Sequence, residues 1–157
     1  MIVIDGHNLL WAVHEMTGGS GISGEVALCH TISRYLKLAS DVGLIVFDGT
    51  GPSDKSGFDN ISNLEVLFSG LSTDADSVIE SKVRANGMAR GMTVVSSDRQ
   101  LRRVSQTKKA AVVKAEEFWR TVQTELGRKK VDEPSAKRHG LSESETDRWL
   151  ELFGFEQ

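Results

Sequence analysis

The sequence predicts an α/β sandwich with a mainly parallel central sheet. Short apolar runs typical of buried strands alternate with longer segments whose apolar residues recur at helical spacing. Strands that alternate with helices favour crossover connections, which place helices on both faces of a parallel sheet. With 157 residues, the chain is long enough for one such domain and a short appendage.

Five short apolar runs predict the strands. They lie at residues 2–4, 44–47, 64–68, 92–96 and 110–113. Each run is rich in aliphatic residues and has the length of a strand that is buried on both faces. Gly43 and Gly91 precede the second and fourth runs, and Asp5-Gly6 follows the first, as expected where strands meet turns.

The segments between these runs predict the helices. They are expected within 9–24, at 25–40, from Thr73 or Asp74 to Asn86, at 98–104 and at 116–126. Apolar residues recur three or four positions apart in the longer helices. Glycine-rich stretches at 18–21 and 49–60 predict loops, and Gly127 is a typical residue at which a helix ends.

The chain changes character after this glycine. Residues 128–141 are charged, polar and interrupted by Pro134, which predicts a linker. Residues 142–157 begin with a capping box and continue with apolar residues, which predicts a short amphipathic helix. Because such a short helix is unstable alone, we expect it to dock on its own domain or on a protein partner.

Charge is distributed unevenly along the sequence. Residues 1–100 hold 12 Asp/Glu against 7 Lys/Arg, whereas residues 99–138 hold 12 Lys/Arg against 5 Asp/Glu. An acidic region beside a basic one favours an enzyme that binds a polyanion around a metal ion. The alternative is that the basic side chains only solvate helix surfaces.

The compartment is expected to be the cytoplasm. The sequence has no apolar run long enough to cross a membrane, and its strand-like start is unlike a signal peptide. The single cysteine, Cys29, cannot form an intramolecular disulfide and is expected to be a small buried side chain in a helix. We therefore expect no membrane association.

Carboxylates follow three of the expected strands. Asp5, Asp48 and Asp98 each come after an apolar run, and the carboxyl ends of parallel strands meet at the edge where ligands bind. Asp76 and Glu80 are four residues apart near the start of a helix, so they share a face at the same edge. Acids gathered in one crevice repel one another unless a cation lies among them. The five residues are therefore candidate ligands of Mg²⁺ or Mn²⁺.

Such a site favours hydrolysis of a phosphodiester, because a bound cation activates water and offsets charge in the transition state. Asn8, close after Asp5, is expected to orient a phosphate or a water through its amide. Ser97 is expected to donate a hydrogen bond to phosphate, and Arg99 and Arg102 to bind backbone phosphates. Each acid taken alone has a simpler explanation as a turn residue or a helix cap.

Four segments of the sequence form a recognisable set. They read IVIDGHNLL at the N-terminus, VFDG at 46–49, FSG followed by TDADSVIE at 73–80, and VVSSDRQLR at 94–102. Together they resemble the YacP-type NYN domains of the PIN-like nuclease group over residues 1–127. The resemblance implies a PIN-like three-layer α/β/α sandwich and divalent-metal-dependent cleavage of RNA. The family includes a ribosome-associated endoribonuclease.

The same resemblance implies which residues are catalytic. It maps the acidic site onto Asp5, Asp76 and Asp98, with Asn8 and Asp48 close by. The family pattern at the helix reads approximately T-A-D-[DS], and an aspartate at position 74 takes the place of the threonine here. That substitution adds a negative charge near the site.

Three functions remain open at this point. The first is an endoribonuclease that uses Mg²⁺ or Mn²⁺ on single-stranded RNA, with mRNA at the ribosome as the implied setting. The second is a non-catalytic RNA- or ribosome-binding module whose acids are relics or structural caps. The third, a small-molecule phosphatase or a receiver-like domain, fits poorly. His7 stands where such a phosphatase needs a second aspartate, and Lys114 lacks the proline that follows the receiver lysine.

Overall fold

Five parallel strands form the central sheet of the computed structural model, which describes residues 1–132. The elements, in chain order, are β1 (Ile2–Asp5), α1 (Gly6–Thr17), α2 (Glu25–Leu38), β2 (Gly43–Phe47), the 3₁₀ turn η1 (Ser56–Phe58), β3 (Leu64–Phe68), α3 (Ala75–Ala85), the 3₁₀ turn η2 (Ala89–Gly91), β4 (Thr93–Val95), α4 (Arg99–Thr107), β5 (Ala111–Val113) and α5 (Ala115–Asp132). The strand order is β3-β2-β1-β4-β5. The order reverses between β1 and β4, which is the point where parallel α/β sheets bind ligands.

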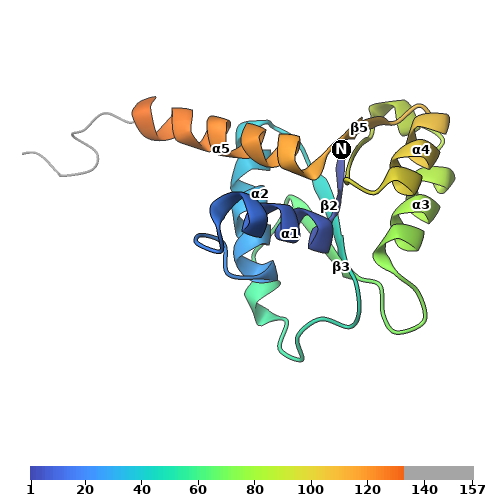
Figure 1. The fold of residues 1–157 in the computed structure, drawn as a ribbon, viewed down its shortest axis with the longest axis horizontal. Helices are drawn as coiled ribbons and strands as arrows, with labels where there is room; N and C mark the ends of the chain where they lie inside the picture. The colour runs from blue at the N-terminus through green and yellow to red at the C-terminus, as the bar shows by residue number, and fades with distance from the viewer. Residues whose placement is uncertain (133–157) are drawn as a thin grey trace, which may run out of the picture. The chain divides into compact units, whose positions relative to one another are not determined.

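Helices cover both faces of this sheet, with α1 and α2 on one side and α3 and α4 on the other (Figure 1). Side chains alternate between the two faces along each strand. One face packs its valines and leucines against α3 and α4 in a buried cluster that includes Val3, Val46, Ile79, Val94 and Leu101. The other face buries Ile4, Ile45 and Phe47 completely. The predicted α/β/α sandwich with a parallel sheet is therefore confirmed.

The first helix begins earlier than the sequence predicts. We expected it within 9–24, but α1 starts at Gly6, directly after β1. The cause is Asp5, whose side chain accepts a hydrogen bond from the backbone N–H of Asn8 at 3.4 Å and so caps the helix. The helix ends at Gly18, which adopts a left-handed conformation with a φ of 62°.

The last described helix is longer than the sequence predicts. The expectation that it ends at Gly127 is wrong, because α5 continues through Asp132. Gly127 does not have a positive φ and is an ordinary helical residue, which costs only about 1 kcal/mol relative to alanine. Residues 128–132, expected in the linker, are thus helical. The rest of that segment and the expected helix at 142–157 lie outside the described residues.

The described helices give no sign of a membrane span. None of the helices within residues 1–132 is long and apolar enough to cross a bilayer.

Candidate active site

Strand alternation brings three polar side chains to the same side of the sheet at its carboxyl edge. Val3 and Val94 are register partners on the face that packs against α3. Asp5 and Ser96 each lie two residues further along, so they point to that face as well. Asp48 reaches the same region, because its Oδ1 accepts a hydrogen bond from the backbone N–H at the start of α3, at 2.7 Å.

The carboxyl groups of Asp5 and Asp76 interact directly within this region. Asp5 is only 6% exposed. Burial, followed by the hydrogen bond and the negative charge of Asp76, raises the pKa of Asp5 to about 7. Burial also raises the pKa of Asp76, and the charges of Asp98, Asp74 and Asp48 add to the increase. Negative charge is therefore costly at this acidic edge of the sheet in the absence of a cation. The edge formed by Asp5, Asp48, Asp76 and Asp98 is called the crevice below.

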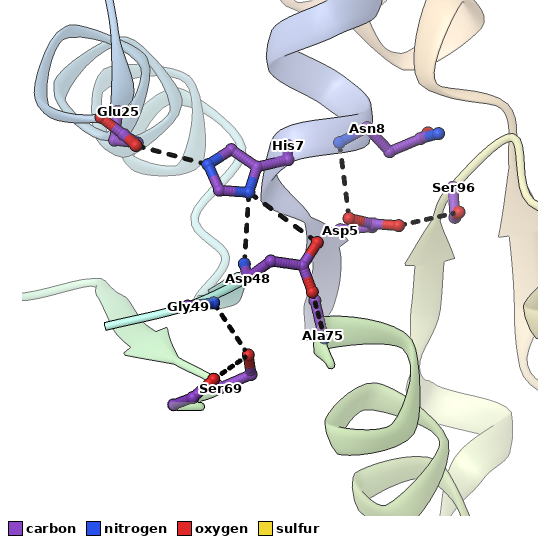
Figure 2. Close-up of polar contacts among 10 residues, drawn as sticks. Asp5, His7, Asn8, Glu25, Asp48, Gly49, Ser69, Ala75 and Ser96 are labelled. Atoms are coloured by element: carbon purple, nitrogen blue, oxygen red, sulfur yellow. Dashed lines mark hydrogen bonds and ion pairs between the residues drawn. The ribbon is translucent and has the colours of Figure 1, made fainter. Parts of the chain in front are cut away.

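Ser96 connects Asp5 to the loop that follows β4. Its side chain is completely buried, and its hydroxyl donates to Asp5 Oδ2 at 3.4 Å (Figure 2). The same hydroxyl accepts from the backbone N–H of Asp98 at 3.1 Å. Asp98 in turn caps α4 by accepting from the N–H of Leu101 at 2.8 Å. Sequence reasoning missed Ser96, although its place two residues after a core valine was the available signal.

Asn8 joins the start of α1 to the same loop. Its side-chain oxygen accepts a hydrogen bond from the backbone N–H of Ser97 at 2.9 Å. Asn8 therefore bridges the two central strands at the point where the strand order reverses. Its expected contact with phosphate or water stays a prediction.

Ser97 faces α5. Its hydroxyl donates to Glu116 Oε2 at 2.9 Å and accepts from the backbone N–H of Ala115 at 3.2 Å. Because a hydroxyl has one proton to donate, the proton expected to bind phosphate is directed at Glu116 instead. In this structure Ser97 holds the first turn of α5 in place.

His7 links the crevice to α2 (Figure 2). The backbone N–H of Asp48 donates to His7 Nδ1 at 3.2 Å, and His7 Nε2 lies 3.3 Å from Glu25 Oε1. With Nδ1 as an acceptor, a neutral ring carries its proton on Nε2 and donates it to Glu25. The ring edge also packs against Phe47, with centroids 5.2 Å apart. His7 thus positions the backbone at Asp48.

Glu80 is paired with an arginine of its own helix. Arg84, one turn later on α3, donates to its Oε1 through Nε at 2.9 Å and approaches it through Nη2 at 2.7 Å. The charges that raise the pKa values of Asp5 and Asp76 come from Asp48, Asp74, Asp76 and Asp98. The helical spacing that predicted it as a metal ligand is correct, but its carboxylate is occupied by an arginine.

The two arginines predicted to bind phosphate lie on α4 next to Asp98. Arg99 is exposed, and Arg102 is half-buried. Within residues 1–132, the Nε of Arg102 is buried with no hydrogen-bond partner. Both lie in or just after the first turn of the helix that Asp98 caps. Both arginines therefore lie beside Asp98, and their expected contact with phosphate stays a prediction.

The family model of the YacP-like NYN domain matches residues 2–152. The chain belongs to this family. The match continues past residue 127, where the resemblance carried by the motifs ended.

The solved structures similar to this NYN domain agree with its fold. The crystal structure of Rae1 (YacP) from Bacillus subtilis is similar with a TM-score of 0.67 and 20% identity, over 98% of this chain and 92% of that one. Its W164L mutant is similar with a TM-score of 0.61 and 24% identity, over 81% and 77% of the two chains. No curated protein matches this chain. The predicted family is confirmed, and such a domain is consistent with a ribonuclease.

The crevice of the NYN domain offers the oxygen donors that Mg²⁺ and Mn²⁺ prefer. Within residues 1–132, no three His, Cys, Asp or Glu side chains stand close enough to form a complete metal-binding group. Asp5 and Asp76 form the close pair. One carboxylate oxygen of Asp48 and one of Asp98 each accept a hydrogen bond from a backbone N–H at the start of a helix. One or two carboxylates are sufficient for Mg²⁺ when waters and a substrate phosphate complete the coordination. The residues present fit a cation of that kind.

Proposed function

We propose that this NYN domain is a divalent-metal-dependent endoribonuclease that hydrolyses phosphodiester bonds in single-stranded RNA. The observation that carries the proposal is the contact between the buried Asp5 and the half-buried Asp76 at the carboxyl edge of the sheet. Two acids that face each other in such a place destabilise a fold, so this pair is a candidate for function. A cation between them removes the repulsion.

Each residue of the crevice has a separate role in this proposal. Asp5 and Asp76 hold Mg²⁺ or Mn²⁺, which supplies a water of lowered pKa and offsets charge on the phosphate. Ser96 orients the Asp5 carboxylate through its hydrogen bond to Oδ2. Asp48 and Asp98 add negative charge that favours the cation, and both also fix the helix ends that border the crevice.

The substrate class follows from the charge beside the acids. Arg99 is exposed one residue after Asp98, and Arg102 lies on the next turn of α4. Arginines beside a metal site suit the phosphates of a nucleic acid backbone. The proposal includes mRNA at the ribosome as the substrate, as the family resemblance implies. It also includes a cytoplasmic location, as the single cysteine and the strand-like start of the sequence predict.

The direct test is an RNA cleavage assay with the full chain. A single-stranded RNA labelled at both ends is incubated with Mn²⁺ or with EDTA, for wild type and for Asp76→Asn. We expect internal cleavage by wild type only with Mn²⁺, and a loss of at least about 100-fold in Asp76→Asn, because it removes one of the two charged ligands.

The matched control is Asp74→Asn in the same helix turn. Asp74 is exposed and caps α3 by accepting from the N–H of Ser77 at 2.7 Å, a role that asparagine also fills. Asp74→Asn should keep most of the activity. Equal rates for wild type and folded Asp76→Asn would contradict the proposal.

A non-catalytic RNA-binding module is the second candidate. It is favoured by the absence, within residues 1–132, of a three-residue metal-binding group. RNA binding by the wild-type chain without metal-dependent cleavage of any RNA tested would support this candidate.

A further inference from the structure

A basic pocket lies at the edge of the sheet opposite the acids. It has a volume of about 620 Å³ and is lined by the end of α3, the 86–91 segment and the two residues after α4. Its charged lining consists of Arg84, Arg90, Lys108 and Lys109, with no acidic side chain. Gly91 lies just before β4, whereas the acids follow the other end of that strand. The pocket and the crevice are therefore separate sites.

The charge of this pocket is largely uncompensated. Arg84 pairs with Glu80, but Arg90, Lys108 and Lys109 have no ion-pair partner among residues 1–132. Lysines after a helix are favourable because they face its negative end, which accounts for Lys108 and Lys109. That explanation does not cover Arg90, which comes from the separate turn η2 and lines the same pocket. Cations that converge from two segments favour an anionic ligand.

Helix α4 connects the acids to the pocket. It is capped by Asp98 at the crevice and is followed by Lys108 at the pocket, a span of about 15 Å at the rise of an α-helix. Leu101 is buried on its inner side. Arg99 and Arg103 are exposed and four residues apart, so they share an outer face. Positive charge therefore continues along α4 from one site to the other.

We propose that the basic pocket binds a backbone phosphate of the RNA strand whose scissile bond lies at the acidic crevice. This inference rests on the proposed function and adds a second contact, a few nucleotides from the cleaved bond, that captures RNA without reading its sequence. Arg90, Lys108 and Lys109 bind the phosphate, and Arg99 and Arg103 follow the strand between the two sites. Contacts to phosphate position a nucleic acid and make its affinity depend on salt.

The test uses the full chain with the double variant Arg90→Glu/Lys108→Glu. The matched control is Arg34→Glu/Lys37→Glu, which makes the same change of charge at exposed positions of α2, on the other side of the sheet. Binding of a fluorescent single-stranded RNA of about 12 nucleotides is measured by anisotropy in EDTA over a series of salt concentrations.

We expect the pocket variant to bind at least about tenfold more weakly than the control. The slope of log affinity against log salt should fall by about 0.7, because the contact to one phosphate is lost and each phosphate contributes about 0.7 for a single strand. With Mn²⁺, kcat/KM on the same RNA should fall while kcat is kept, since the pocket captures substrate and does not touch the reacting atoms.

Two results separate the inference from the proposed function. If the pocket variant and the control bind RNA with equal affinity, the proposed role of the pocket in RNA binding is overturned, even if wild type cleaves RNA. Weaker binding by the pocket variant, together with a wild type that never cleaves RNA, supports the pocket as an RNA site and overturns the nuclease. If the glutamate variant does not fold by circular dichroism, Arg90→Gln/Lys108→Gln provides the same comparison with a slope change in the same direction.

Discussion

The side chains of Asp5 and Asp76 meet although one ends the first strand and the other lies in the first turn of α3. Their meeting depends on two local features. Strand alternation points Asp5 toward α3, and Asp48 holds the start of α3 against the sheet by accepting the N–H of Ala75. The acidic crevice is thus a product of the fold itself, at the position where parallel sheets bind ligands.

Asp5 should make the protein less stable as the pH rises. Its pKa in the folded state is about 7, against 3.8 as the ordinary value, so the native state binds more protons than the unfolded state between these values. The stability that Asp5 contributes by binding a proton in the folded state is fully present below about pH 4, and it is lost as the pH rises through 7. The free energy of unfolding, measured with urea, should be lower at pH 8 than at pH 5 by about 2–4 kcal/mol, at roughly 1.4 kcal/mol for each pKa unit.

The variant Asp5→Asn isolates this effect. It should lose most of the pH dependence and be more stable than wild type at pH 8, because the amide carries no charge to desolvate. Addition of Mg²⁺ at pH 8 should stabilise wild type more than the variant. An unchanged pH dependence in Asp5→Asn would mean that another group is responsible.

Ser96→Ala should weaken both the fold and the crevice. The buried hydroxyl connects Asp5 Oδ2 with the N–H of Asp98, so its removal takes one hydrogen bond from each of these two groups. We expect a loss of about 1–3 kcal/mol in the free energy of unfolding, measured with urea, and a lower rate of RNA cleavage. Wild-type stability and rate in this variant would show that the bridge is dispensable.

Ser97→Ala distinguishes a structural serine from one that binds phosphate. Because the hydroxyl lies between Glu116 and the N–H of Ala115, the variant should lose about 1 kcal/mol of stability and keep its KM for RNA. The measurements are urea unfolding and steady-state cleavage. A KM that rises severalfold with unchanged stability would restore the phosphate-binding role predicted from the sequence.

Two glycine-to-alanine variants should change stability in opposite directions. A Cβ at Gly6 would overlap the ring of the fully buried Phe47, so Gly6→Ala should destabilise by about 1–3 kcal/mol. A Cβ at Gly127 meets nothing within 4 Å, and Gly127→Ala should stabilise α5 by about 0.5–1 kcal/mol. Thermal unfolding and helix content by circular dichroism measure both, and destabilisation by Gly127→Ala would argue for a helix that ends there.

Features that depend only on a short stretch of the sequence were predictable. The strand at Leu64–Phe68 has the predicted ends, since an apolar run between polar segments defines a buried strand without reference to the rest of the fold. Asp5 and Asp48 were predictable for the same reason, because each directly follows such a run. Their arrangement around Asp76 then follows from the parallel sheet.

Features that depend on distant partners were not predictable. Ser97 was assigned to phosphate because its partner, Glu116, lies on another element. Glu80 has the right spacing from Asp76 to face the crevice. The sequence alone does not show whether its carboxylate binds a metal ion or pairs with Arg84, as it does in the structure. The basic pocket combines Arg90 with lysines that follow a different helix, so no single segment reveals it.

Binding of Mn²⁺ to the full chain tests the central claim, that Asp5 and Asp76 together hold a divalent cation. Electron paramagnetic resonance of free Mn²⁺ gives the affinity for wild type, Asp5→Asn, Asp76→Asn and the control Glu80→Gln, whose carboxylate is paired with Arg84. We expect either aspartate variant to weaken binding at least about tenfold, whereas Glu80→Gln should bind like wild type. Wild-type affinity in Asp5→Asn and Asp76→Asn would contradict the claim.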